Sequence, residues 1–506
     1  MTTAILKAVA DSNQWWALGP ELTVACGALA LLVLEILVPK KDLRFVPHLV
    51  VVTLLSTLIV VALNFDKTFG GEALFGGLIK LSAPGQVARI FFLLSSLLVC
   101  FLATICLPRA RAPRVEFYHI VLVVTAALML LAQSNHFAMF FVALETVTIG
   151  FYILVSYYRE NPLSLEAGLK YLVLGALSSA ILLFGIVLLY GAVGRVVVAG
   201  VVHTGFEYDT VVNFLREKPD NFLAVAGTLL VIGGVAFKIG AFPFQIWVPD
   251  VYQGAPTPVT AFLAVSSKAA GFAVLLTLVR NVFAPLQAVL VPVLSLLAAT
   301  TIIFGNLSAL KQHNTKRLMG LSGVSHAGYL LVGVVASFTV PWAAGAVWFY
   351  LFTYLLASMA VFGVMAYVAG PDDRGEELDH YEHLARERPF LGAVLAVGVG
   401  SLAGIPPLAG FMGKLLLFLA AFQAHLYGLL VVAIGGVVIS IFYYFGWIRA
   451  AWFASWSPPV PGVPPPARPL PAGPPFVGMV TLTALVFATV LLGFYQQPLT
   501  SWLLLK

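Results

Sequence analysis

Apolar stretches of about twenty residues recur along this chain from end to end, and they leave little choice of fold. About twenty apolar residues are what an α-helix needs to cross the ~30 Å hydrocarbon core of a bilayer. Inside lipid the backbone must satisfy its own hydrogen bonds, so each stretch is expected to be helical. Only 10% of the residues are charged, against about 25% in soluble domains. The sequence therefore predicts an all-α polytopic membrane protein.

Fourteen stretches can be placed as membrane helices, and several exceed the length of a straight crossing, which predicts tilt, a kink or a break. They lie at 21–38, 46–64, 88–107, 115–132, 136–158, 164–192, 222–247, 257–281, 285–308, 315–337, 341–369, 390–423, 425–453 and 476–503. The proline-rich stretch 457–475 before the last of them predicts a stiff polyproline-type connector. The chain, 1–506, is predicted to be one integral membrane domain.

The lysines and arginines of the loops predict the orientation of the chain. Sixteen of the 28 are assigned to loops that follow odd-numbered helices, and nine to the opposite face. Loops rich in these residues stay on the cytoplasmic side of a membrane. Both termini are therefore expected on the periplasmic side of a bacterial inner membrane. The helices would face membrane lipid, and the basic residues form no dense patch that would bind nucleic acid.

Three lysines stand alone in the middle of apolar segments: Lys238, Lys268 and Lys414. Each is at least twelve residues, or roughly 18 Å of helix, from the next Asp, Glu, Lys or Arg. An ionisable residue at such depth is costly, and by default it indicates a transport path. Glu145, in FFVALETVTIG, is an acidic counterpart at a similar depth.

Two of the lysine segments also contain prolines. Pro243 follows Lys238 in FKIGAFPFQIW, whereas Pro406 and Pro407 precede Lys414 in GIPPLAGFMGK. Proline removes a backbone donor and interrupts a helix. Interrupted helices that line a hydrated cavity are typical of ion sites in transporters, and a simple packing kink is the alternative.

These residue types suit the movement of protons. Burial disfavours the charged form of an amine, so a buried lysine can gain and lose a proton, whereas an arginine stays protonated. A change in the distance between Glu145 and Lys238 would load or unload that lysine. Lys268 and Lys414 would extend the path sideways. His326, in LSGVSHAGYLL, could carry protons either way, although a lone histidine is often an ordinary core residue.

No sequence motif indicates a cofactor or a metal. HExxH, a Walker A sequence and a glycine-rich loop between a strand and a helix are missing. The cysteines Cys26, Cys100 and Cys106 lie in apolar stretches without Cys-x-x-Cys spacing, which argues against zinc and iron–sulfur sites. We expect no NADH, flavin, nucleotide or metal on this chain.

Five pieces of the sequence together carry a family resemblance. They are VALETVTIGFYIL around Glu145, KIGAFPFQIWVPDVYQGAPTP at 238–258, SSKAAGF around Lys268, LKQHNTKRLMGLSGVSHAGY at 310–329 and GIPPLAGFMGK at 404–414. They resemble the antiporter-like membrane subunits of proton-pumping respiratory complexes. The phrase YQGAPTPV and a lysine rather than a glutamate in the twelfth helix are most similar to the subunit N branch of bacterial NADH–quinone oxidoreductase, respiratory complex I.

The resemblance implies a division of the chain. Three N-terminal helices (1–114) would precede two inverted five-helix repeats, helices 4–8 (115–281) and helices 9–13 (285–453), each with a broken helix. Helix 14 (476–506) would end the chain.

The resemblance also implies roles for single residues. Glu145 and Lys238 would form the Glu–Lys pair, Lys268 would be the central lysine, His326 the relay histidine and Lys414 the exit lysine. NADH, FMN, iron–sulfur clusters and quinone would be bound by partner subunits. Other antiporter-like subunits and small helical subunits would be the membrane partners.

The expected function is proton translocation coupled to electron transfer elsewhere in the complex, which makes the chain a non-redox subunit of a translocating oxidoreductase. A subunit of a multi-subunit sodium/proton antiporter, or of a related membrane-bound hydrogenase, is the alternative, since it would share the lysines and the broken helices. A site for sodium transport would be expected to contain more intramembrane carboxylates than Glu145 alone. A bundle that merely anchors partners is a third possibility, which the cost of buried lysines opposes.

Overall fold

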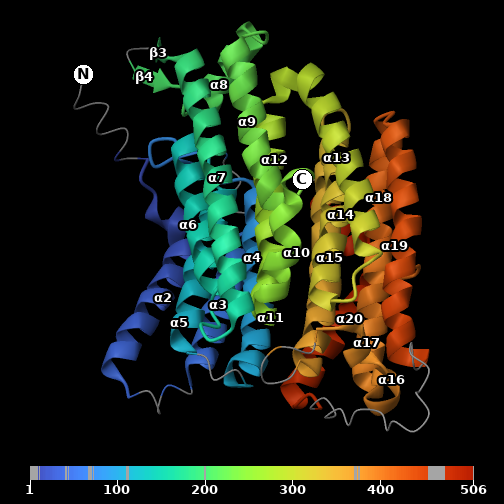
Figure 1. Ribbon diagram of the computed structural model, residues 1–506. Coiled ribbons are helices and arrows are strands. Elements are labelled where there is room, and N and C mark those ends of the chain that lie inside the picture. Colours follow the sequence, from blue (N-terminus) through green and yellow to red (C-terminus); the bar gives the residue numbers. More distant parts are fainter. Residues whose placement is uncertain are drawn as a thin grey trace.

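The computed structural model of the chain is a bundle of long helices that run from one end of the molecule to the other (Figure 1). The described residues are 10, 12–39, 43, 45–65, 71, 73–109, 113–198, 201–369, 373, 376–453 and 473–504. In these ranges, thirteen helical segments are long and apolar enough to cross a membrane, and two shorter apolar helices lie between the eleventh and the twelfth. The shorter pair occupies the stretch 390–423, so the prediction of fourteen crossings with a broken twelfth is confirmed.

The elements follow one another along the chain with few long loops between them. The first part forms η1 (Trp15–Leu18), α2 (Gly19–Leu37), α3 (Val46–Leu63), α4 (Ala83–Arg109), α5 (Val115–Ala132), α6 (Phe137–Val155), α7 (Pro162–Val193) and α8 (Tyr208–Glu217). The middle forms α9 (Phe222–Ile239), η4 (Phe244–Trp247), α10 (Val248–Gly254), α11 (Thr257–Phe262), η5 (Leu263–Ser267), α12 (Lys268–Thr277), η6 (Leu278–Val282), η7 (Ala284–Leu286), α13 (Gln287–Ala309) and α14 (Thr315–Ala336). The last part forms α15 (Ala343–Val368), η8 (Leu378–Tyr381), α16 (Leu384–Glu387), α17 (Pro389–Ala403), α18 (Ala409–Gln423), α19 (Tyr427–Phe453), α20 (Phe476–Phe494) and α21 (Gln497–Leu504).

Asparagine side chains fix the starts of three helices that matter for the site. Asn161, Asn221 and Asn314 precede α7, α9 and α14, and each accepts a hydrogen bond from a backbone N–H in the first turn. Such a cap satisfies a donor that has no partner within the helix. The sequence thus sets where these helices begin at the membrane surface.

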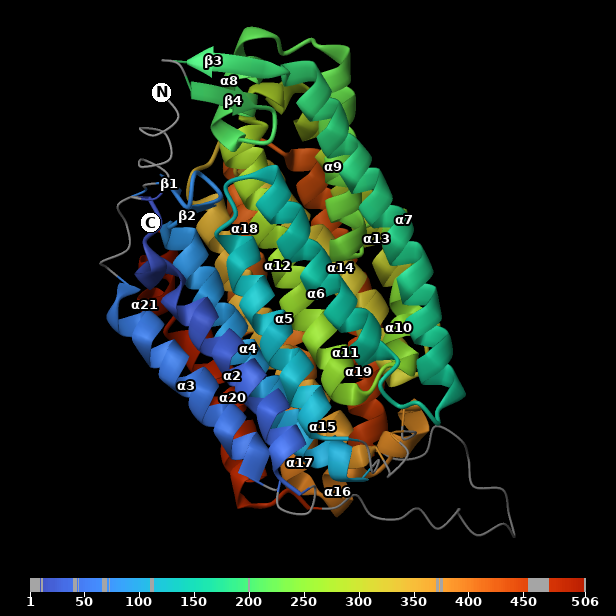
Figure 2. The same cartoon turned by 90° about the vertical axis from the view of Figure 1, so that its left-hand side faces the viewer.

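Two short hairpins and an amphipathic helix were not predicted. Strands β1 (Ala73–Leu74) and β2 (Ile79–Lys80) pair antiparallel, as do β3 (Arg195–Val198) and β4 (Val201–Thr204). Both hairpins lie at the upper end of the bundle in Figure 2, with α8 beside the second. Strands of two and four residues carry too few alternating positions for a sequence pattern to separate them from a loop.

Both ends of the described chain lie at the hairpin end. The backbone N–H of Phe75 donates to the carbonyl of Ser12, which ties the start of the chain to the first hairpin. The ring of Trp502, in α21, packs 5.1 Å from the ring of Phe65, at the end of α3. The predicted connector at 457–475 lies outside the described residues except for 473–475.

The most deeply buried helices are those that carry the central titratable residues. α14 is buried along its length except at the half-buried Arg317, and α12 and α15 are nearly fully buried. Small residues let α14 approach its neighbours closely: a Cβ on Gly305 or Gly328 would fall 2.5 Å from atoms of the facing helix. By contrast, α2, α3, α7, α13 and α19 expose large apolar side chains on the outside of the bundle.

Arg89 lies inside the predicted helix 88–107, but the sequence analysis counted it among the basic residues that report orientation. It lies in α4 and is 1% exposed, and its Nε and Nη2 donate to the two carboxylate oxygens of Glu21 at 2.7 and 2.8 Å. Its Nη2 also donates to the carbonyl of Ala17. The buried pair fastens the start of α2 to α4, so this arginine is no guide to orientation.

The backbone follows a similar course through the two broken helices. α9 ends at Gly240 and α17 ends at Gly404, both in the left-handed region, with φ of +71° and +85°. In each break a cis prolyl bond follows three residues later, before Pro243 and Pro407. Lysine and proline occur in opposite order in the two segments because Lys238 lies just before its break and Lys414 just after. The matched breaks are consistent with the predicted repeats.

Candidate functional site

Lys238 lies in the last turn of α9 and points at α6. Its Nζ donates a hydrogen bond to Oγ1 of Thr148 at 2.7 Å, and that hydroxyl donates to the carbonyl of Leu144. Glu145 is one turn before Thr148 on the same helix, and its carboxylate accepts a hydrogen bond from the hydroxyl of Ser179. Among the described residues, Glu145 and Lys238 form no ion pair. The predicted partners therefore lie on neighbouring helices, each held by a hydroxyl group.

The break after Lys238 is stabilised by other residues. The indole Nε1 of Trp247 donates to the carbonyl of Phe237 at 3.1 Å, and the backbone N–H of Phe242 donates to Oγ1 of Thr301 at 3.0 Å. These bonds satisfy backbone groups that the interrupted helix leaves without partners. The amine of Lys238 is thus left to face α6.

Lys268 follows directly on the π-helical turn η5, a distortion that often marks functional sites. Its Nζ donates to the carbonyl of Gly323 at 2.7 Å and to the hydroxyl of Tyr354 at 3.3 Å. A Cβ on Gly323 would lie 2.8 Å from this amine, so a larger residue there would require the amine to shift. Gly323 precedes His326 by three residues on α14, which brings the lysine to the histidine-bearing helix.

His326 is enclosed by three tyrosines, two of which contact it through their hydroxyl groups. Its Nδ1 is hydrogen-bonded to the hydroxyl of Tyr350, and its Nε2 lies 3.0 Å from the hydroxyl of Tyr444. The ring of Tyr354 is 5.0 Å from the imidazole ring. A neutral imidazole carries one donor and one acceptor, and a phenol can fill either role. The arrangement can therefore hand a proton from one side of the ring to the other.

Lys414 lies in α18 and contacts the end of α17 across the second break. Its Nζ donates to the carbonyls of Leu402 and Ala403, both at 2.9 Å, which are among the last carbonyls of α17. A cation suits this position because the end of a helix carries partial negative charge. The amine also lies 5.2 Å from the ring of Tyr329, which is 6.0 Å from the ring of His326.

The structure brings three of the five predicted residues into one connected series. Lys268, His326 and Lys414 are joined through aromatic side chains of α14, α15 and α19, while Glu145 and Lys238 form a separate group on α6 and α9. The three lysines and the histidine are between 2% and 6% exposed. In the described part of the chain, no hydrogen bond links Lys238 to Lys268.

Sequence reasoning missed the tyrosines that connect the series. Tyr350 and Tyr354 are four residues apart on α15, so they share a face of that helix, and this spacing was the only signal available. Tyr329 and Tyr444 come from other helices, and only the packing of the bundle places them beside His326. A buried tyrosine in an apolar helix is otherwise indistinguishable from core.

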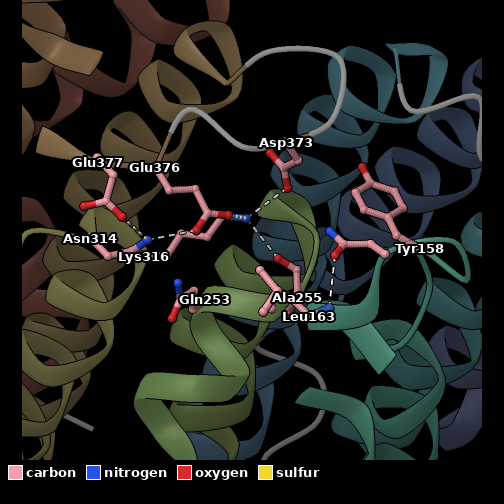
Figure 3. A pocket seen from close by; sticks show the side chains of 11 residues that line it. Tyr158, Leu163, Gln253, Ala255, Asn314, Lys316, Asp373, Glu376 and Glu377 are labelled. Carbon is pink, nitrogen blue, oxygen red and sulfur yellow. Dashed lines mark hydrogen bonds and ion pairs between the residues drawn. The ribbon is translucent and has the colours of Figure 1, made fainter. Parts of the chain in front are cut away.

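A cluster of charged residues was also missed, at the end of the bundle opposite the hairpins. Nζ of Lys316 lies 2.9 Å from Oδ2 of Asp373 and 2.8 Å from Oε1 of Glu376, and it donates to the carbonyl of Ala255. These residues and Tyr158 line a cavity of about 180 Å³ (Figure 3). The sequence analysis counted Lys316 with the loop residues for the orientation, although it lies in the predicted helix 315–337; in the structure it is buried in α14.

A second cavity, of about 660 Å³, lies at the hairpin end between the two halves of the bundle. Ala88, Ala273, Trp348 and Trp502 are among its lining residues. The helical segment Thr257–Val282 runs from the smaller cavity to the larger, and Lys268 lies between its ends. Among the described residues, no group of His, Cys, Asp and Glu could hold a metal ion.

The Tyr354→Phe variant tests the hydrogen bond between Lys268 and the tyrosine whose ring packs against His326. The change keeps the ring, which lies 4.8 Å from the amine of Lys268, and removes the oxygen that accepts its hydrogen bond. We expect proton transfer through the chain to slow by about two- to tenfold, the size of one hydrogen bond. Tyr381→Phe, at a buried tyrosine beside Trp447, is the matched control. Equal proton transfer in the two variants would contradict the link.

Comparison with known proteins places this geometry in a family. A family model described as NADH:quinone oxidoreductase/Mrp antiporter, TM, matches residues 134–440. The chain is 59% identical to NADH-quinone oxidoreductase subunit N 1 of Opitutus terrae over 508 residues, 100% of each chain. It is 36% identical to NADH-quinone oxidoreductase subunit N of Desulfitobacterium hafniense over 96% of each chain.

Solved structures agree with this placement. A chain of respiratory complex I from Thermus thermophilus with bound aureothin is 32% identical, with a TM-score of 0.77 over 95% of this chain and 98% of that one. A chain of the Mrp complex from Dietzia sp. has a TM-score of 0.79 over 96% of each chain at 20% identity, which shows a shared fold alone. The sequence identity over the whole length and the match in structure together show that the chain belongs to the family of NADH-quinone oxidoreductase subunit N.

Proposed function

We propose that this chain is a proton-translocating, non-redox membrane subunit of an NADH–quinone oxidoreductase in a bacterial inner membrane. The observation that carries the proposal is the buried series from Lys268 through His326 to Lys414, in which titratable groups are connected by tyrosines. Side chains that gain and lose protons are expensive in the middle of a bilayer, and a transport path is the use that accounts for them.

In the proposed mechanism, Glu145 and Lys238 control the loading of the series. When the Glu145 carboxylate approaches Lys238, it favours the charged amine; when it returns to Ser179, the charged amine loses that support. Lys238 then releases its proton toward Lys268. From there the proton passes by His326 to Lys414 and the outer face.

Electron transfer takes place on partner subunits, which would bind NADH, FMN, iron–sulfur clusters and quinone. The exposed apolar sides of α2, α13 and α19 would contact lipid, other antiporter-like subunits or small helical subunits. We assign the hairpin end, with both termini, to the periplasmic side, and the cluster around Lys316 to the cytoplasmic side. The proposed division is 1–114, repeats at 115–281 and 285–453, the connector 457–475, and helix 14 at 476–506.

The purified complex reconstituted in sealed vesicles tests the function. Oxidation of NADH by quinone is expected to move protons across the membrane in sodium-free medium, and a protonophore should abolish the gradient. The sodium/proton antiporter alternative predicts exchange that needs sodium and proceeds without NADH or quinone. Proton movement that disappears when sodium is removed would overturn the proposal in favour of that alternative.

A further inference from the structure

The first turn of α14 holds both ends of the half-helix α10. The Nη1 of Arg317 donates to Oδ1 of Asp250 at 2.7 Å and to Oε1 of Gln253 at 3.0 Å. The neighbouring Lys316 donates to the carbonyl of Ala255, the residue that caps α10. Lys316 and Arg317, adjacent cations of α14, therefore both hold α10, a helix of only seven residues. α10 directly follows η4, which in turn follows the break beside Lys238.

Asp250 joins three helices at this point. Its Oδ2 accepts a hydrogen bond from Nζ of Lys170, in α7, at 2.6 Å, while Oδ1 accepts from Arg317. Lys170 also pairs with Glu166 in its own helix. α7 and α10 belong to the predicted first repeat and α14 to the second, so the bond between Asp250 and Arg317 connects the two repeats.

The same α14 carries groups of the proton series. Gly323, which accepts from Lys268, and His326 follow Arg317 by six and nine residues, or about 9 and 14 Å along the helix. At its other end, α10 continues back through η4 to Trp247, whose indole bonds to the residue before Lys238. Asp250 is thus connected through α10 to the group at Lys238 and through Arg317 and α14 to the group at Lys268.

The contact is more constrained than an ordinary surface ion pair. Exposed pairs contribute little because two flexible side chains must be ordered. Here each carboxylate oxygen of Asp250 has its own cationic partner, and the adjacent Lys316 is buried against Asp373 and Glu376, which fixes the first turn of α14 (Figure 3). The helix turn that carries Arg317 is therefore fixed in place, and its guanidinium contacts α10 from that fixed turn.

We propose that Asp250 is a positioning residue for proton transfer: its bond to Arg317 ties the half-helix α10, and with it the break beside Lys238, to the helix that holds Lys268 and His326 in place. The inference rests on the proposed function, because it concerns how the loading of Lys238 is passed to the central lysine. Asp250 touches no residue of the series and acts through the position of α10.

The test uses Asp250→Asn, Arg317→Gln and the double variant in the assembled complex. Subunit content, quinone reduction and protons moved per electron are measured for each. Each single variant is expected to assemble and to slow proton transfer about tenfold, the effect of one charged hydrogen bond. The double variant should be no worse than either, because both changes remove the same bond. Arg317→Gln serves alone if Asp250→Asn does not assemble.

Lys170→Gln is the matched control. It removes the other cationic partner of Asp250 but leaves the connection between the repeats, so proton transfer should stay within about twofold of the parent. A loss there equal to that of Arg317→Gln would overturn the inference, as would single-variant losses that multiply in the double variant. If Asp250→Asn pumps normally while Lys238→Met does not, the positioning role fails and the proposed function stands. Normal pumping by Lys238→Met would instead count against the function itself.

Discussion

A complex that carries Lys238→Met is expected to assemble and to reduce quinone, but to move far fewer protons for each electron. Methionine fills the space of the lysine stem in the last turn of α9 and cannot carry a proton. The break itself should persist, because Trp247 and Thr301 satisfy its backbone without help from the lysine. Removal of a group that transfers protons slows the step that it serves by about 10²–10⁴-fold.

The measurement compares acidification by sealed vesicles with quinone reduction in the same preparation. Lys218→Met makes the same chemical change at an exposed lysine beyond α8, so it controls for loss of charge alone. It should leave protons per electron unchanged. An unchanged ratio in Lys238→Met as well would rule out the loading role proposed for this lysine.

Lys268→Arg should abolish proton transfer through this subunit although it keeps the positive charge. The guanidinium can still donate to the carbonyl of Gly323 and the hydroxyl of Tyr354, but it does not release its proton in proteins. We expect a loss as large as that of Lys268→Met, again about 10²–10⁴-fold in the step concerned. Proton movement per electron in vesicles is the readout.

The pair of substitutions separates two roles for the central amine. If Lys268 only balanced charge or held α14, arginine would restore what methionine loses. If Lys268 must discharge in each cycle, both variants fail alike. Pumping by Lys268→Arg at the parent rate would exclude discharge of this lysine from the mechanism.

The sequence allowed the membrane helices and the breaks to be predicted, and the roles of the five candidate residues remain predictions. Apolar length predicts a crossing whatever its neighbours are, and a lysine far from other charges signals its burial without any tertiary information. Lys238, Lys268, Lys414 and His326 are all buried as expected. The predicted pairing of Glu145 with Lys238 depends on the distance between two helices, and in the structure each of the two side chains is hydrogen-bonded to a hydroxyl group instead.

The connections between the candidates could not be predicted, because they depend on how distant helices pack. Tyr444 reaches His326 from more than a hundred residues away, and nothing local distinguishes it from other aromatic residues of α19. Arg89 and Lys316 show the opposite error. Because they are charged, both were counted with the loop residues for the orientation, but buried carboxylates neutralise both, and the partners lie 68 and 57 residues away in the chain.

The position of Lys414 has a thermodynamic consequence. Its ammonium group donates to the last carbonyls of α17, so the charged amine holds that half-helix against α18 more tightly than a neutral amine would. The contact between the half-helices and the proton affinity of the amine are linked, and such linkage is reciprocal. An outside force that separates α17 from α18 must therefore also change the proton affinity of Lys414. A mechanical displacement arriving from a neighbouring subunit could therefore expel a proton at this joint without any chemical reaction inside the chain.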